Sequence, residues 1–146
     1  MKETVKNTEL EKKVFAASAD NFSSLAIELF RFQYEHNPVY RQYCDAIHTD
    51  ADAVLLPEKI PFLPISFFKT RQVISTRFEP QAIFESSGTT QTINSKHLVK
   101  QLDIYKTSFN KTFEIFYGSP NEWCILALLP SYLERTNSSL VLMAEE

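Results

Sequence analysis

The stretch Pro57–Pro64 contains three prolines within eight residues and constrains the middle of the chain more than any other feature. Proline fixes its own φ angle and lacks a backbone N–H, so no regular helix can run through this stretch and an extended path is expected. The residues between the prolines are largely apolar, which predicts that they are buried. We therefore expect 56–80 to be an ordered, packed connection between a helical section, 1–55, and a second section, 81–146.

Length and composition predict one folded domain with a substantial apolar core. The chain has 146 residues, 44% of them hydrophobic, with 12 Phe, 6 Tyr and 1 Trp. A chain of this size can bury about two thirds of its unfolded surface, and so many aromatic residues exclude disorder as the main state. Only two glycines occur, so a glycine-containing ligand loop has to be built around Gly88 or Gly118.

Three helices are expected in the first section. One is predicted over about 9–19, with Thr8 in a capping-box position; a second begins after a cap at Asp20 and ends at His36; a third starts at Pro38. The residue before a proline disfavours the helical region, which separates the second helix from the third. The apolar face of the third helix is expected to consist of Tyr40, Tyr43, Cys44 and Ile47.

The sequence pattern of the second section predicts an α/β fold, in which the N-terminal helices pack on a partial βαβ sheet. Short strands are expected near 82–85 and 122–129, with an amphipathic helix over 95–117 crossing between them and ending at Gly118. A right-handed crossover follows if the strands are parallel. The helix should bury a stripe of apolar residues, although an acyl-binding pocket is an alternative use for its aromatic members. The stripe is Leu98, Leu102, Tyr105, Phe109, Phe113 and Phe116.

A last helix is predicted from about Ser138, and the sequence stops at Glu146 after about two turns. We therefore expect the chain to be the N-terminal part of a longer protein. Apolar surface around Tyr132 and over Leu140–Met143 would then be uncovered, which predicts a homo-oligomer.

The charge pattern points to an anionic ligand rather than to nucleic acid. The net charge is −3 overall, but it is +4 over 69–111. A solvated helix face is the alternative reading of this basic stretch. The N-terminus lacks the apolar region of a signal peptide, and no apolar run is long enough to cross a membrane, so a cytoplasmic protein is expected. Cys44 and Cys124 are expected to be buried free thiols.

The segment with the clearest chemistry is Ser86-Ser87-Gly88-Thr89-Thr90. Glycine allows a tight turn and close approach of a ligand, and successive backbone amides can form a nest for an anion. The hydroxyl groups add small donors, and the nearby Lys96 adds positive charge. This composition predicts a phosphate-binding loop. A polar turn between two secondary-structure elements is the alternative.

The same five residues resemble the phosphate-binding signature of the adenylate-forming enzymes. The surroundings extend the likeness: Ile-Pro-Phe-Leu-Pro-Ile-Ser-Phe-Phe-Lys precedes the loop, and an aromatic helix and an apolar stretch ending Leu-Leu-Pro-Ser-Tyr-Leu-Glu-Arg follow it. Over about 20–146 the chain resembles the acyl-protein synthetases of the LuxE type, which are similar to phenylacetate–CoA ligases.

The resemblance implies an adenylate-forming fold and an ATP- and Mg²⁺-dependent ligase that converts a fatty or aryl carboxylic acid into an acyl-adenylate. The acyl group would then pass to a thiol of a protein cysteine or of coenzyme A. By the same resemblance, the β- and γ-phosphates of ATP would be held by Ser86, Ser87, Gly88, Thr89 and Thr90, with Lys96 as the next lysine. The family's adenine, metal and acceptor-cysteine residues lie beyond this sequence, so the isolated chain is expected to be inactive.

Other candidate residues carry weaker signals, and no catalytic residue or metal ligand is assigned. Ser131 follows an expected strand, which is a position that a nucleophile can occupy, but a helix cap explains it better. His36, His48 and His97 lack metal-ligand spacing; His97 is either an exposed residue or a phosphate contact. A second interpretation of the whole chain is a non-catalytic truncated paralogue or interaction module that uses its exposed apolar surface.

Overall fold

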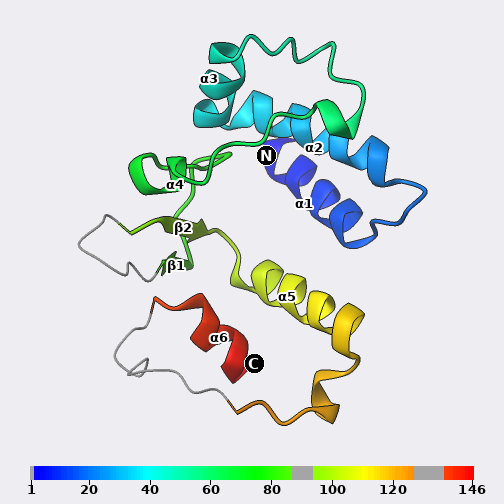
Figure 1. Cartoon of the computed structure of the whole chain (residues 1–146), viewed down its shortest axis with the longest axis vertical. Coiled ribbons are helices and arrows are strands. Elements are labelled where there is room, and N and C mark those ends of the chain that lie inside the picture. Colours follow the sequence, from blue (N-terminus) through cyan, green and yellow to red (C-terminus); the bar gives the residue numbers. More distant parts are fainter. Residues whose placement is uncertain (1, 87–93, 127–136) are drawn as a thin grey trace. The chain divides into compact units, whose positions relative to one another are not determined.

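The computed structural model describes residues 2–86, 94–126 and 137–146, and it divides into two compact units. The helical unit comprises Met1–Phe67 with Arg71–Arg77, and the hairpin unit comprises Phe68–Thr70 with Phe78–Glu146. Figure 1 labels the helices and strands of both units. Each unit is described by itself below.

Three helices form the helical unit: α1, Lys2–Phe15; α2, Phe22–His36; and α3, Pro38–Ala46. The expected cap at Thr8 is wrong, because α1 already begins at Lys2 and Thr8 lies inside it. The cap of α2 is Asn21 rather than Asp20.

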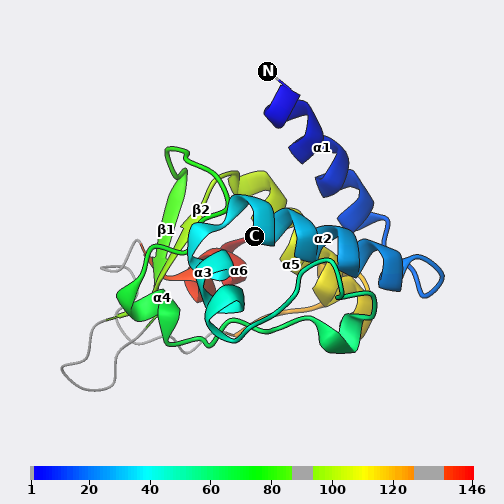
Figure 2. The ribbon, with the colours of Figure 1, turned by 90° about the horizontal axis from the view of Figure 1, so that it is seen from above.

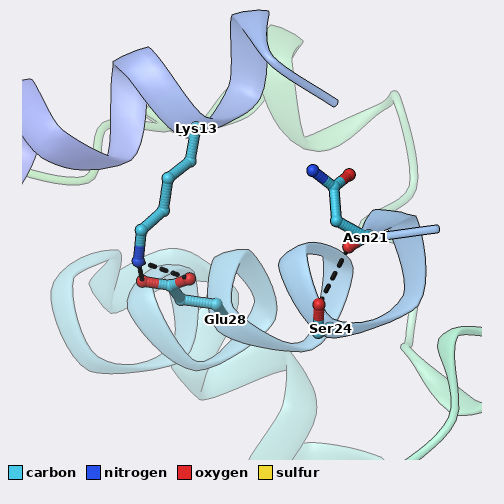
Figure 3. Close-up of polar contacts among 4 residues, drawn as sticks. All are labelled: Lys13, Asn21, Ser24 and Glu28. Atoms are coloured by element: carbon cyan, nitrogen blue, oxygen red, sulfur yellow. Dashed lines mark hydrogen bonds and ion pairs between the residues drawn. The ribbon is translucent and has the colours of Figure 1, made fainter. Parts of the chain in front are cut away.

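The loop between α1 and α2 is organised by Asn21. Its side-chain oxygen accepts a hydrogen bond from the Ser18 N–H at 2.7 Å, while its backbone oxygen accepts one from the Ser24 hydroxyl at 2.9 Å. Lys13 Nζ lies 2.7 Å from Glu28 Oε1 and ties the two helices together (Figure 3). This ion pair is exposed, so it contributes little to stability.

The Asn37–Pro38 junction turns the chain from α2 into α3, as predicted. Asn37 is buried, and its side-chain oxygen accepts a hydrogen bond from the Tyr40 N–H at 3.1 Å. Pro38 occupies the first turn of α3, where a missing N–H costs nothing. The two helices pack against each other and lie side by side in Figure 2.

The core of the helical unit forms where α2 and α3 meet the chain that follows them. Its buried members are Phe30, Tyr40, Cys44 and Val54. The rings of Phe30 and Tyr40 meet edge to face with 6.1 Å between their centroids. The Tyr40 hydroxyl donates to the Pro61 carbonyl at 2.6 Å, which fastens the proline-rich segment to this core.

No α-helix runs through the proline-rich segment Pro57–Pro64, as predicted, but the path is not extended throughout and its apolar side chains are not all buried. After the short 3-10 helix η1, Pro57–Lys59, the side chains of Ile60 and Leu63 pack against the core, whereas Phe62 and Ile65 are each 82% exposed. The segment ends at α4, Phe67–Thr70.

The two cysteines differ in environment, which corrects the expectation that both are buried. Cys44 is fully buried and Cys124 is exposed. Burial also raises the pKa of the Cys44 thiol, so less of the reactive thiolate forms at a given pH.

We therefore expect iodoacetamide at pH 8 to label Cys124 at least about a hundredfold faster than Cys44, since access to a buried thiol requires local opening. Peptide mass spectrometry would measure both rates. In urea the two rates should converge, and equal rates in the native protein would contradict the assigned burial.

The hairpin unit contains two strands: β1, Ala82–Glu85, and β2, Lys96–Val99. They pair antiparallel, with Phe84 opposite His97 and Glu85 opposite Lys96, and Figure 2 shows them side by side. The strand β1 was predicted, but a helix over 95–117 and a parallel βαβ unit were not correct for the described residues. The chain is α/β only in the general sense of helices with a small antiparallel sheet.

The helix α5, Leu102–Tyr117, begins several residues later than predicted because β2 occupies the preceding stretch. The first residue, Leu102, donates its N–H to the side-chain oxygen of Gln81 at 2.7 Å, so a residue next to β1 satisfies a free helix-end donor. Gly118 closes the helix with φ of 80°, as predicted. Such an angle is accessible mainly to glycine.

The apolar stripe of α5 is covered at one end only. Tyr105 packs on Phe84 with 5.1 Å between ring centroids, and Phe109 packs on Tyr105 at 5.7 Å. Phe109 and Phe113 are half-buried, whereas Phe116 is 74% exposed. The expected burial of the whole stripe is therefore wrong, because the two-stranded sheet is too short to cover a helix of 16 residues.

The 3-10 helix η2, Pro120–Glu122, follows α5. The strand expected over 122–129 is absent from its described part, since 123–126 has no regular secondary structure; 127–129 lies outside the described residues.

The last helix, α6, Ser139–Glu145, agrees with the prediction: the Ser138 side chain accepts the Val141 N–H at its start. Lys106 of α5 forms an ion pair with Glu146, next to the end of α6. Among the described residues, no helix combines the length and apolar character needed to cross a membrane.

Candidate functional site

The predicted phosphate loop follows directly from β1. Ser86 is described and exposed, whereas Ser87, Gly88, Thr89 and Thr90 lie outside the described residues. The antiparallel pairing of β1 and β2 brings Ser86 opposite Ser95 at the end of the hairpin. The loop was expected between a strand and a helix, and instead connects two strands of one hairpin.

Two hydrogen bonds between Ser86 and Ser95 hold this end of the hairpin together. The Ser86 N–H donates to the Ser95 carbonyl at 3.1 Å, and the Ser95 N–H donates to the Ser86 hydroxyl oxygen at 3.0 Å. The first residue of the predicted loop is thus tied to the residue just before Lys96.

Lys96, the predicted positive residue, is the first residue of β2. Its Nζ lies 3.5 Å from Glu85 Oε1, and its side chain is 62% exposed. Both side chains are on the sheet face opposite Phe84, because neighbouring residues of a strand alternate between faces. The structure places Lys96 at the hairpin end beside Ser86, with a carboxylate that offsets part of its charge.

His97 lies on the other face of the hairpin from Lys96. Its ring packs edge-on against Tyr105, with 5.9 Å between centroids, and partial burial lowers its pKa. A histidine with a pKa below its ordinary value of about 6.5 is neutral at pH 7. It therefore adds no positive charge for an anion. Among the described residues, no group of three or more metal-binding side chains occurs.

A further contact at the hairpin end was not foreseen from the sequence. The Glu85 N–H, which points away from β2, donates to the Asn137 carbonyl at 3.0 Å. In an antiparallel pair, alternate residues direct their N–H groups outward, so this donor is open to a third segment. The contact brings the residue that precedes the Ser138 cap of α6 next to the start of the predicted loop. No local sequence pattern signals such a pairing.

The described residues therefore form a polar hairpin end with the hydroxyls of Ser86 and Ser95, the ammonium group of Lys96 and the carboxylate of Glu85. The hydroxyl and ammonium groups can donate hydrogen bonds to an anion, whereas the Glu85 carboxylate would repel it. Ser131, the other hydroxyl considered, lies outside the described residues. Cys44 is buried in the helical unit, and Cys124 is exposed beyond η2.

The comparison with protein families extends over almost the whole chain. Residues 5–141 match the family described as acyl-protein synthetase, LuxE. The chain belongs to the LuxE family of acyl-protein synthetases. This confirms the predicted resemblance to the LuxE-type acyl-protein synthetases.

A curated relative of this LuxE-family chain is the long-chain-fatty-acid–luciferin-component ligase of Photorhabdus luminescens. The two are 41% identical over 66 residues, which is 44% of this chain and 56% of the relative. The match thus spans just over half of the relative's length. No solved structure matches the chain.

Proposed function

We propose that this LuxE-family chain forms the phosphate-binding part of an enzyme that activates a carboxylic acid with ATP and passes the acyl group to a thiol. The observation that carries the proposal is the family match over residues 5–141. The printed name of the Photorhabdus relative, a ligase acting on long-chain fatty acids, favours a fatty acid as the substrate.

Ser86, Ser87, Gly88, Thr89 and Thr90 would surround the β- and γ-phosphates of ATP in this reaction. When the acid oxygen attacks the α-phosphorus, the bond to the bridging oxygen breaks and negative charge grows on the departing pyrophosphate. Backbone N–H groups and hydroxyls fixed around that charge lower the barrier. Lys96, at the hairpin end, would add a positive charge near the same phosphates.

The described donor set fits an anionic ligand better than a bare metal ion. Mg²⁺ keeps several waters and is usually held by phosphate oxygens with one or two carboxylates. By the same rule, Mg²⁺ would arrive with the triphosphate. Its chemistry there would be to neutralise phosphate charge, and no residue of this chain is assigned to it.

The exposed apolar surface favours a second candidate, an interaction module that pairs with another chain or with a second copy of itself. In the hairpin unit this surface comprises Ile115, Phe116, Tyr117, Trp123, Ile125 and Leu126. Such extended apolar exposure is typical of surfaces that another segment covers. This candidate predicts association without any ATP chemistry.

Fatty-acid-dependent exchange of labelled pyrophosphate into ATP distinguishes the two candidates. If the protein is a ligase, the intact enzyme should exchange pyrophosphate into ATP only when both the fatty acid and Mg²⁺ are present. Association measured by light scattering, without exchange at any acid tested, would instead support the interaction module and contradict the ligase.

Removing one loop hydroxyl is expected to weaken this exchange without abolishing it. Thr89→Ala or Thr90→Ala should lower kcat/KM for ATP by roughly 10–150-fold, because a hydrogen bond to a charged group is worth about 1.5–3 kcal/mol. Steady-state pyrophosphate exchange would measure the change.

Thr107→Ala is the matched control for these threonine variants. Its hydroxyl donates to the Asp103 carbonyl within α5 at 2.8 Å, away from the hairpin end. Exchange should be unaffected by this change. If all three variants are as active as the wild type, the hydroxyls of Thr89 and Thr90 do not bind the phosphates.

A further inference from the structure

The end of the β1–β2 hairpin departs from a regular ladder at one pair of residues. In an antiparallel sheet, a hydrogen-bonded pair exchanges two backbone N–H···O=C bonds. The pair Ser86 and Ser95 makes the first of these, from the Ser86 N–H to the Ser95 carbonyl. In the return direction, the Ser95 N–H donates to the hydroxyl oxygen of Ser86 at 3.0 Å. A side chain thus takes the place of a backbone acceptor.

This substitution ties the side chain of Ser86 to the backbone on the opposite strand. A serine hydroxyl has two acceptor lone pairs and one proton to donate. One lone pair is engaged by Ser95, and this fixes the direction in which the hydroxyl points. This bond uses an acceptor lone pair of the Ser86 hydroxyl and does not use its proton, so it restrains the side chain without excluding it as a donor.

Contacts of the two residues before Ser86 hold this pair in place. Phe84 is buried against Tyr105 and anchors β1, while Glu85 donates its N–H to the Asn137 carbonyl and lies 3.5 Å from Lys96. The strand is therefore fixed on both edges just before Ser86. The hydrogen bond from the Ser95 N–H to the Ser86 hydroxyl oxygen lies directly before residues 87–93, which are outside the described residues.

We propose that Ser86 is a positioning residue: its hydroxyl binds the Ser95 N–H and sets the point at which the phosphate-binding loop leaves and rejoins the hairpin. This rests on the proposed function and adds a positioning role to the one proposed there for Ser86.

The experiment compares Ser86→Ala with Ser86→Thr. Alanine removes the acceptor, whereas threonine keeps a hydroxyl on the same carbon, and its methyl group suits an exposed residue at the end of a strand. Ser24→Ala is the matched control, since the Ser24 hydroxyl also bonds a backbone group but lies in the helical unit (Figure 3).

The first measurement is hydrogen exchange of the Ser95 amide by NMR without ATP. Ser86→Ala should speed this exchange about five- to tenfold, because the amide loses its acceptor. Ser86→Thr and Ser24→Ala should leave it within about twofold of wild type. Unchanged exchange in Ser86→Ala would overturn the proposed bond and with it the positioning role.

The second measurement is acid-dependent pyrophosphate exchange by the intact enzyme. Ser86→Ala should lower kcat/KM for ATP about tenfold, and Ser86→Thr should restore it together with the protection of the Ser95 amide. If Ser86→Thr restores the amide but not kcat/KM, the hydroxyl does not act through Ser95 and the proposal fails.

The two measurements separate failure of this inference from failure of the proposed function. Faster Ser95 exchange with unchanged kcat/KM in Ser86→Ala would overturn the positioning role, while wild-type activity would still support the ligase. Absence of pyrophosphate exchange in the wild type would instead overturn the proposed function, and the positioning role with it.

Discussion

Gly88→Val is expected to abolish acid-dependent pyrophosphate exchange, with a loss of more than about a hundredfold in kcat/KM for ATP. A glycine between serines and threonines permits backbone amides to approach a phosphate closely, and a valine side chain would fill the space that the phosphate oxygens need. The assay is exchange by the intact enzyme, with ATP binding measured separately by calorimetry. The variant should remain folded, as judged by circular dichroism.

Gly118→Ala is the matched glycine control for this experiment. Gly118 has φ of 80°, so alanine there is strained and should lower the free energy of unfolding by about 1–3 kcal/mol. A Cβ atom at Gly118 would meet nothing within 4 Å, so no ligand space is lost. At a temperature where both variants are folded, only Gly88→Val should lose exchange. Wild-type exchange by Gly88→Val would contradict the loop assignment.

Phe30→Ala is expected to destabilise the helical unit by about 3–5 kcal/mol. Phe30 is 3% exposed and packs against Tyr40 and Tyr34, so its removal leaves a cavity between α2 and α3. Such a loss is a large fraction of the stability of a typical domain. Urea denaturation followed by far-ultraviolet circular dichroism would give the change in the free energy of unfolding.

Phe62→Ala provides the control for Phe30→Ala. The two residues are the same type, but Phe62 is 82% exposed, and its replacement should change the free energy of unfolding by no more than about 0.5 kcal/mol. Equal destabilisation by the two variants would show that Phe62 is covered in solution and would contradict its exposure here.

Several local elements could be predicted from neighbouring residues alone. Asn37 followed by Pro38 separates α2 from α3, Ser138 begins α6, and Gly118 ends α5. Each of these depends on a cap, a proline or a glycine acting within about one helical turn. The LuxE family, too, could be identified from the loop and the proline-rich segment.

The candidate site was predicted only as a group of residues. The sequence indicated Ser86 and Lys96 as members, but not that Ser86 would bond the Ser95 amide or that Lys96 would face Glu85. These contacts depend on the register of the hairpin. Because Leu98 continues the helical spacing of the α5 stripe, residues 95–101 matched a helix pattern as well as a strand.

The sequence by itself determined the junction between α2 and α3, the start of α6, the end of α5 and the residue types around Gly88, because those features depend on groups a few residues apart. Only the tertiary structure decided that 96–99 pairs with β1, that Asn137 meets Glu85 and that Phe62 is exposed while Tyr40 binds Pro61. Pairing of distant segments is a competition among all apolar and hydrogen-bonding partners in the chain. Its outcome depends on which donors and side-chain faces the rest of the fold leaves uncovered.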